Sequence, residues 1–138
     1  MANYTVPHKA TLPDGLQPGS VIRVRGTIPA NGNRFYVNLL CSESSAADTV
    51  LHCNPRLDSG EMVFNTFQDG AWGQEERSPS VPFHRGQSFD LFIIAAGDSY
   101  KAVVDDIVFH RFSHRLPMQL VRVLEVGGDV QLQSVSVL

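Results

Sequence analysis

Apolar and polar residues alternate along most of the chain with the two-residue period of β-strands. The run RFYVNLLC, which begins at Arg34, is the cleanest case, because every second residue of its first six is apolar. Successive side chains of a strand point to opposite faces, so this segment predicts a half-buried strand with a functionalised polar face. The run SVIRVRGT at residues 20–27 alternates less perfectly and also predicts a strand.

Further β-rich runs are separated by turns that contain Gly, Pro or Asp. These runs occupy residues 51–57, 62–67, 88–96, 100–104, 107–112, 120–126 and 130–138. The turns at 97–99 and 127–129 each predict a hairpin between the flanking runs. No segment shows helical periodicity with caps over ten or more residues. Short strands at this spacing predict an all-β fold, a sandwich or jelly roll, in a single domain spanning residues 1–138.

Composition and charge narrow the classes of partner. Of the 138 residues 43% are hydrophobic, and the net charge of −3 comes from scattered signs, so we expect no nucleic-acid partner. No apolar run approaches the roughly 18 residues of a membrane span, so we expect no membrane insertion. The N-terminus lacks the apolar segment of a secretory signal, and we expect synthesis in the cytosol with Cys41 and Cys53 as reduced thiols.

Residues 51–77 concentrate polar and aromatic groups that a plain β-domain does not need. If 51–57 is a strand, His52, Asn54 and Arg56 share one face. Pro55 supplies no strand hydrogen bond, which favours an edge or an irregular position. A row of hydrogen-bonding side chains suits a polyhydroxylated ligand, although an outward polar face is also the default of a sandwich.

Trp72, Glu75 and Arg77, which follow the predicted strand at 62–67, add to this candidate site. Trp72 lies in a Gly-Ala-Trp-Gly turn, with a glycine near it on each side. A tryptophan in a small β-protein is usually in the core, but such a turn favours an exposed tryptophan that can stack on a sugar. Glu75 and Arg77 share a face, and Arg56 could reach the same carboxylate. Cationic neighbours hold such a carboxylate ionised, as a hydroxyl acceptor and a poor general acid; the alternative is a solvated surface ion pair.

Catalytic and metal-binding chemistries are disfavoured. Glycoside hydrolysis needs two carboxyl groups, whereas the candidate face offers Glu75 alone, with Asp58 or Asp69 as less plausible partners. His110 and His114 are four residues apart, but no helix brings them together. We therefore expect no enzyme activity, no metal and no cofactor, and binding without chemistry.

The motifs in this stretch resemble the sugar-binding signature of the galectins. HCNPR at residues 52–56, VFN at 63–65 and WGQEER at 72–77 agree with that signature in order, residue type and spacing. Segments near both ends of the chain are also similar to vertebrate galectins, so the resemblance covers essentially the whole chain. It implies a jelly-roll sandwich of two antiparallel sheets that binds β-galactosides of the lactose and N-acetyllactosamine type.

The resemblance also implies roles for individual residues. His52, Asn54 and Arg56 would bond the axial 4-hydroxyl of galactose, and Trp72 would stack under the ring. Asn65 would take the 6-hydroxyl.

The remaining implied roles concern the second sugar and the groove around it. Glu75 would share the 6-hydroxyl and, with Arg56, reach the second sugar of a disaccharide. Arg77 would orient Glu75, and Arg34 would line the same groove from the neighbouring strand.

Two residues depart from the family pattern, and the resemblance carries further expectations. Cys53 stands where galectins usually have phenylalanine, so this departure affects core packing. Tyr36 stands where similar vertebrate galectins have histidine, so this departure affects the preference for extended glycans.

The resemblance implies a homodimer that crosslinks glycoconjugates, signal-peptide-independent secretion from cytoplasm and nucleus, and roles in cell adhesion, growth control and apoptosis. The alternative is an intracellular protein-interaction module on the same scaffold.

Overall fold

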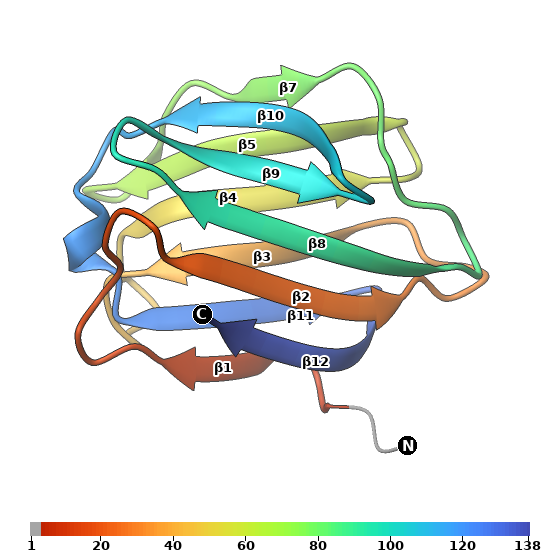
Figure 1. Cartoon of the computed structure of the whole chain (residues 1–138), viewed down its shortest axis with the longest axis horizontal. Helices are drawn as coiled ribbons and strands as arrows, with labels where there is room; N and C mark the ends of the chain where they lie inside the picture. Colours follow the sequence, from red (N-terminus) through yellow and green to blue (C-terminus); the bar gives the residue numbers. More distant parts are fainter. Residues whose placement is uncertain (1–3) are drawn as a thin grey trace.

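The computed structural model describes residues 4–138, and most of this part of the chain lies in two antiparallel sheets packed face to face (Figure 1). The five-stranded sheet has the order β10 (Ile107–Ser113), β9 (Ser99–Val104), β8 (Ser88–Ala95), β2 (Val21–Thr27) and β12 (Gln131–Val137). The seven-stranded sheet has the order β1 (His8–Thr11), β11 (Val123–Gly128), β3 (Phe35–Leu40), β4 (Thr49–Arg56), β5 (Glu61–Gln68) and β6 (Ala71–Trp72), and β7 (Glu76–Ser78) also pairs with β5. The predicted all-β sandwich of two antiparallel sheets is confirmed.

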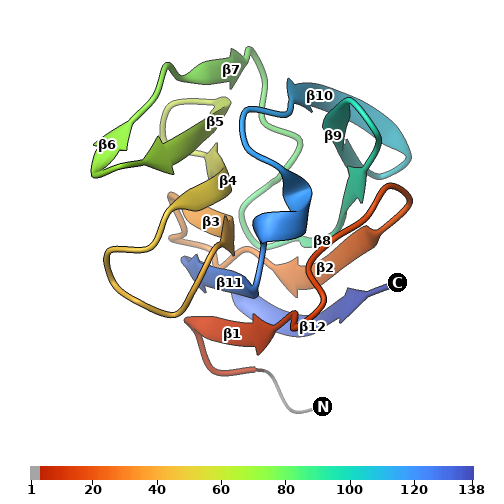
Figure 2. The same ribbon diagram turned by 90° about the vertical axis from the view of Figure 1, so that its left-hand side faces the viewer.

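Figure 2 shows the two layers edge-on, and the core fills the space between them. The alternation seen in the sequence assigns the faces: Phe35, Val37 and Leu39 of β3 are fully buried. The rings of Phe35, Phe83 and Phe89 lie 5.0–5.2 Å apart, in edge-on and stacked pairs of the kind that aromatic cores favour. Burial of alternate side chains leaves the others on the outer faces of the sheets.

The turn at residues 127–129 does not close the predicted hairpin. The hairpin predicted at 97–99 is confirmed, since β8 pairs with β9. By contrast, β11 pairs with β1 and β3, and β12 pairs with β2 in the other sheet. Gly128 has φ 91°, and the Asp129 N–H donates to the Arg34 carbonyl at 2.8 Å. The chain therefore crosses between the sheets here, and the hairpin prediction was wrong.

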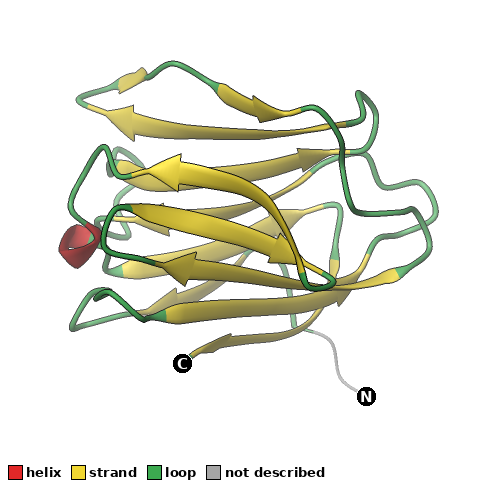
Figure 3. Ribbon diagram, turned by 45° about the horizontal axis from the view of Figure 1, so that its top comes forward, coloured by secondary structure: helices red, strands yellow, loops and turns green. Residues whose placement is uncertain are grey.

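Short elements account for the other differences from prediction. The strand predicted over 120–126 begins only at Val123, because Met118–Leu120 forms a 3-10 turn, η1, shown in red in Figure 3. The strands β1, β6 and β7 have two to four residues each, too few for a periodic pattern. The first three residues of the predicted single domain lie outside the described residues, and that domain assignment stays a prediction.

Pro55 and Cys53 lie in β4, a central strand of the seven-stranded sheet. The β3–β4 ladder stops at the pair Val37–Cys53 and returns only as an isolated bridge between Arg34 and Arg56. Pro55 thus occupies an irregular position rather than an edge strand. Cys53 is fully buried on the core face, and burial raises the pKa of its thiol to about 12. Its departure from the family pattern therefore concerns packing, as predicted.

Replacing Gly128 by alanine should destabilise the crossing between the sheets. A Cβ at Gly128 would lie 2.8 Å from the Phe35 Cα and 2.9 Å from the Arg34 carbonyl oxygen, and the residue has φ 91°. Backbone strain and the clash together should lower the free energy of unfolding by about 2 kcal/mol. Urea denaturation measures this change. Gly19→Ala is the control, because Gly19 has φ 97° and a Cβ there would meet no atom within 4 Å; equal losses for both variants would contradict the packing argument.

Candidate functional site

The register of three adjacent strands places polar side chains side by side on the outer face of the seven-stranded sheet. Asn38 of β3 lies opposite His52 of β4, and His52 lies opposite Asn65 of β5. Directly opposed residues point to the same face, so the three side chains form a row across the sheet. The row combines residues that are 27 positions apart in sequence, and strand pairing alone aligns it.

His52 is held as a neutral hydrogen-bond acceptor. Its Nδ1 lies 2.6 Å from Asn38 Oδ1, and Asn38 Nδ2 in turn donates to Glu125 Oε1 at 3.3 Å. Since an amide oxygen only accepts, Nδ1 carries the proton, and Nε2 is left with its lone pair. Burial, aided by the charge of Arg56 and opposed by Glu75, lowers the pKa of His52 to about 4.

Trp72 is displayed on this face and held from two sides. The turn before it has positive φ at Asp69 (53°) and Gly70 (79°), the combination of a type I′ hairpin turn. The Trp72 ring lies 5.2 Å from that of Phe67 and 4.9 Å from that of His52. With 54% of its surface exposed, Trp72 is a fixed apolar plate rather than a core residue, as predicted.

Asn54 lies beneath the surface and positions Arg56. Only 8% of Asn54 is exposed; its Nδ2 donates to the Phe35 carbonyl at 2.7 Å, and its Oδ1 accepts from Arg56 Nε at 2.9 Å. The side chain of Asn54 thereby occupies the gap that the interrupted β3–β4 ladder leaves. Arg56 is fixed at Nε and keeps its remaining N–H groups for other partners.

Glu75 is held ionised between arginines. Arg77 Nη2 donates to Glu75 Oε1 at 2.5 Å, and Arg77 also pairs with Glu61. Arg56 Nη2 lies 3.7 Å from Glu75 Oε2. The hydrogen bond from Arg77, with the charges of Arg77 and Arg56, lowers the pKa of Glu75 below its ordinary value. The carboxylate is therefore an acceptor at neutral pH.

These residues surround a hollow of about 450 Å³. It is lined by His52, Arg56, Val63, Asn65, Trp72, Gly73 and Glu75. A second hollow of about 570 Å³ shares His52 and Trp72 with the first and continues over β3 and β1, toward Tyr36 and Lys9. The two hollows adjoin at His52 and Trp72 and together form a groove across the sheet. The smaller hollow is surrounded by the indole of Trp72, a neutral acceptor, a carboxylate and a guanidinium.

The predicted site residues divide into those that line the hollow and those behind them. His52, Arg56, Asn65, Trp72 and Glu75 line it.

The other three hold this lining or lie beside it. Asn54 supports Arg56, and Arg77 supports Glu75. Arg34 bonds Asp58 at 3.1–3.2 Å and reaches the site through its backbone bridge to Arg56. Its place in the groove stays a prediction.

Asn38, Glu125 and Arg115 belong to the site but were missed as site residues. The sequence pattern could have identified Asn38 as a site residue, because Asn38 lies on the polar face of the alternating run that begins at Arg34. Glu125 comes from β11 and Arg115 from the segment after β10, both remote in sequence from residues 51–77, so only the folded structure shows that they lie near the site. Arg115 donates to Asn65 Oδ1 at 2.9 Å.

Within residues 4–138 no cluster of three or more His, Cys, Asp or Glu could hold a metal ion. His110 Nε2 pairs with Glu76 at 2.8 Å, whereas His114 Nε2 bonds the Ala96 carbonyl. In the same part of the chain no helix has the length and apolar character to cross a membrane.

Comparisons with known proteins agree with this geometry. The family model described as galactoside-binding lectin matches residues 7–137. Galectin-7 of Homo sapiens is 58% identical over 132 residues, covering 96% of this chain and 97% of the relative; galectin-7 of Mus musculus is 53% identical, covering 94% and 96%. The solved structure of a variant of human galectin-16 matches with a TM-score of 0.93 at 30% identity, over 100% of this chain and 99% of that one.

Proposed function

The chain belongs to the galactoside-binding lectin family, the galectins, and on that basis we propose that the groove binds β-galactosides of the lactose and N-acetyllactosamine type. The observation that carries this proposal is the exposed Trp72 plate beside a neutral His52 and an ionised Glu75. An indole face packs against the C–H face of a sugar ring, and the flanking groups exchange hydrogen bonds with its hydroxyls.

We assign the roles of the lining residues by family membership, and the geometry supports them. His52 Nε2 accepts a hydrogen bond from the axial 4-hydroxyl, while Arg56, oriented by Asn54, donates to the same oxygen. Asn65 donates to the 6-hydroxyl, and Trp72 stacks under the ring.

Other residues extend the proposed contacts to the second sugar. Glu75 accepts a hydrogen bond from the 6-hydroxyl and, with Arg56, contacts the second ring. Arg77 holds the carboxylate in place, and Arg34 lies beside the groove at the Arg56 end.

The family consists of carbohydrate-binding lectins rather than enzymes. Among the described residues that line the hollow, Glu75 is the one carboxylate, whereas hydrolysis of a glycosidic bond takes two. The low pKa of Glu75 also makes it a poor proton donor. Binding without turnover follows from both the family and the residues.

The protein should bind lactose much more tightly than cellobiose. The two disaccharides differ only in the configuration of the 4-hydroxyl on the non-reducing sugar. An equatorial 4-hydroxyl would leave His52 Nε2 and Arg56 without their partner, and each unpaired group costs about 1–3 kcal/mol. We expect cellobiose to bind at least about 30-fold more weakly than lactose by isothermal titration calorimetry. Equal affinities, or no retention of the folded protein on immobilised lactose, would contradict the proposal.

We also propose that the chain acts as a homodimer that crosslinks glycoconjugates. Crosslinking requires at least two sites per particle, and a second site raises avidity without new contacts. Light scattering after gel filtration should give twice the mass of 15.2 kDa, and the protein should agglutinate galactose-bearing vesicles in a lactose-sensitive way. A monomer at every concentration would contradict this.

The family further supports residence in cytoplasm and nucleus, secretion without a signal peptide, and roles in cell adhesion, growth control and apoptosis, all of which we propose for this chain. Secretion should persist when transport from the endoplasmic reticulum is blocked. Co-precipitation of cytosolic proteins that survives saturating lactose would instead favour the protein-interaction module.

A further inference from the structure

Arg115 connects the two sheets at the edge of the groove. It lies between β10 and η1, in the segment that runs along the end of the sandwich facing the viewer in Figure 2. Its guanidinium reaches the seven-stranded sheet: Nη1 donates to Asn65 Oδ1 at 2.9 Å, and Nη2 donates to the Gln74 carbonyl at 2.6 Å and to Glu76 Oε2 at 3.1 Å. The other oxygen of Glu76 pairs with His110 Nε2 at 2.8 Å. One side chain thus joins a strand and a loop that border the groove.

Contacts with Phe112 and with the neighbouring His114 hold Arg115 in place. The guanidinium carbon of Arg115 lies 4.7 Å from the centre of the Phe112 ring. The neighbouring His114 donates from Nε2 to the Ala96 carbonyl at 2.8 Å and from its backbone N–H to the Asp98 carbonyl at 3.2 Å. Because these hydrogen bonds hold the backbone next to Arg115 against the turn between β8 and β9, the guanidinium of Arg115 is held at the edge of the groove.

The contacts of Asn65 determine which way its amide faces. Oδ1 accepts from Arg115 Nη1 and from the Thr66 N–H at 2.8 Å, so both of its lone pairs are used. Nδ2 donates one N–H to the Gly73 carbonyl at 2.9 Å, and an amide nitrogen has two. A reversed amide would set N–H groups against the donors of Arg115 and Thr66. Asn65 therefore presents a donor to the hollow that it lines.

Gly73 leaves the space in which this junction forms. A Cβ at Gly73 would lie 2.9 Å from Arg115 Nη1 and 3.2 Å from Asn65 Oδ1. A side chain at residue 73 would therefore crowd the guanidinium and the amide where they form their hydrogen bond.

We propose that Arg115 is a positioning residue for recognition of the hydroxymethyl group of galactose. It holds the Asn65 amide in one orientation, so that a single N–H remains for the 6-hydroxyl. Arg115 is not among the residues that line the hollow, so it acts through Asn65 rather than on the sugar. The inference rests on the proposed galactoside binding and adds a residue from the segment between β10 and η1 to the specificity of the site.

The test compares lactose with its 6′-deoxy analogue, in which the galactose 6-hydroxyl is replaced by hydrogen. Wild-type protein should prefer lactose by about tenfold, the effect of losing a well-made hydrogen bond. In Arg115→Met the preference should fall below about threefold. Affinity for the 6′-deoxy sugar should stay within about twofold of wild type, because that sugar never used the Asn65 donor. Arg111→Met, at an exposed position of β10, is the matched control and should keep the full preference.

Other outcomes would overturn the inference. Equal weakening of both sugars in Arg115→Met would indicate a merely structural role, and an unchanged preference would indicate no role. Arg115→Lys serves if the methionine variant does not fold, because one ammonium group cannot replace three separate guanidinium contacts; it should also lose preference. Wild-type protein that binds both sugars equally overturns the Asn65 role, whereas wild-type protein that does not bind lactose overturns the proposed function itself.

Discussion

We expect Trp72→Ala to abolish retention on immobilised lactose while leaving the fold intact. Stacking a sugar on the indole removes on the order of 100 Å² of apolar surface from water, worth about 2.5 kcal/mol, which is roughly 60-fold in affinity. The free energy of unfolding should change by less than about 1 kcal/mol, because 54% of the Trp72 surface is already exposed. Affinity chromatography and urea denaturation measure the two effects.

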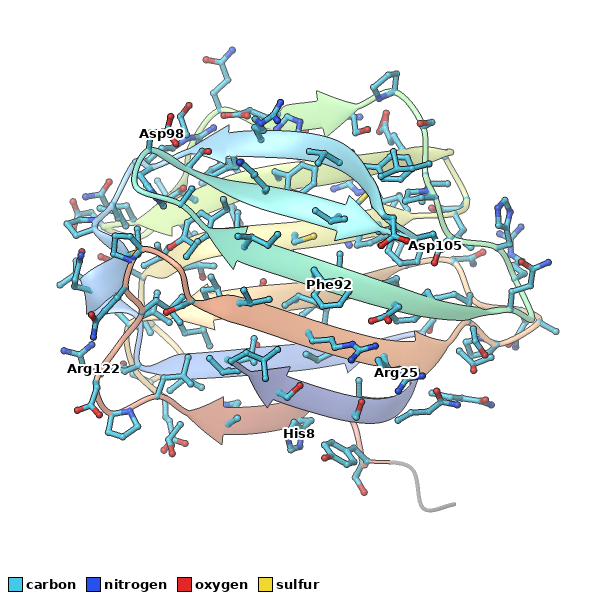
Figure 4. All side chains as sticks on the ribbon, viewed as in Figure 1. His8, Arg25, Phe92, Asp98, Asp105 and Arg122 are labelled. Atoms are coloured by element: carbon cyan, nitrogen blue, oxygen red, sulfur yellow. The ribbon has the colours of Figure 1, made fainter. Side chains whose placement is uncertain are left out.

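Phe92→Ala provides the control for an aromatic residue outside the groove. Phe92 lies on β8 in the five-stranded sheet, on the face toward the viewer in Figure 4, where Arg23 packs over its ring at 5.1 Å. This variant should bind lactose as wild type does. Unfolding of Trp72→Ala, or equal loss of lactose binding in both variants, would mean that the plate supports the sheet rather than the sugar.

The fold could be predicted where strands are long and half-buried. The alternation of apolar and polar residues in β3 predicted which face of the strand is buried, because successive side chains of a strand point to opposite faces. The buried apolar face also fixes the register of the strand. The turn at 127–129 could not be assigned from sequence, since a Gly-rich turn fits a hairpin and a crossing between sheets equally well. Which of the two forms depends on the partner of each strand; here the Arg34 carbonyl receives the Asp129 N–H.

The site could be predicted only as far as its residues are neighbours in sequence. His52, Trp72 and Glu75 fall within one stretch with a family signature, so their types and spacing identified them. Asn38 joins them through strand pairing, and Arg115 joins them through hydrogen bonds from its guanidinium. No local sequence pattern encodes either contact. The direction of the His52 hydrogen bond also needed the structure, because a polar strand face does not reveal which ring nitrogen carries the proton.

Acid should abolish lactose binding near pH 4 and not at the ordinary pKa of histidine. The pKa of His52 is lowered to about 4 in the folded protein, so Nε2 keeps its lone pair through neutral and mildly acidic pH. Affinity should be constant from about pH 7 to 5.5 and fall about tenfold per pH unit below 4. The hydrogen bond from Arg77 lowers the pKa of Glu75 below its ordinary value, so the carboxylate also stays ionised from about pH 7 to 5.5. Quenching of the single tryptophan by lactose measures the affinity at each pH.

The same pKa shift determines how His52 affects stability. The unfolded chain takes up a proton on this histidine near pH 6.5, the ordinary value, whereas folded His52 does so only near pH 4. Between these values the unfolded state binds more protons, so the contribution of His52 to the free energy of unfolding falls as the pH falls and stops falling below about 4. Loss of binding and loss of stability therefore occupy different pH windows and can be separated by chemical denaturation at about pH 5.

Asn38→Asp tests whether the Asn38 contact sets the state of His52. A carboxylate beside Nδ1 would raise the pKa of His52, turning Nε2 into a donor at pH values where wild type presents an acceptor. Lactose affinity of this variant should be reduced at about pH 6 and recover as the pH rises, whereas wild type should be flat over that range. Asn31→Asp adds the same charge in the exposed turn between β2 and β3 and should follow wild type. An acid limit that stays near pH 4 in Asn38→Asp would show that burial alone, and not the Asn38 partner, keeps His52 an acceptor for the galactose 4-hydroxyl.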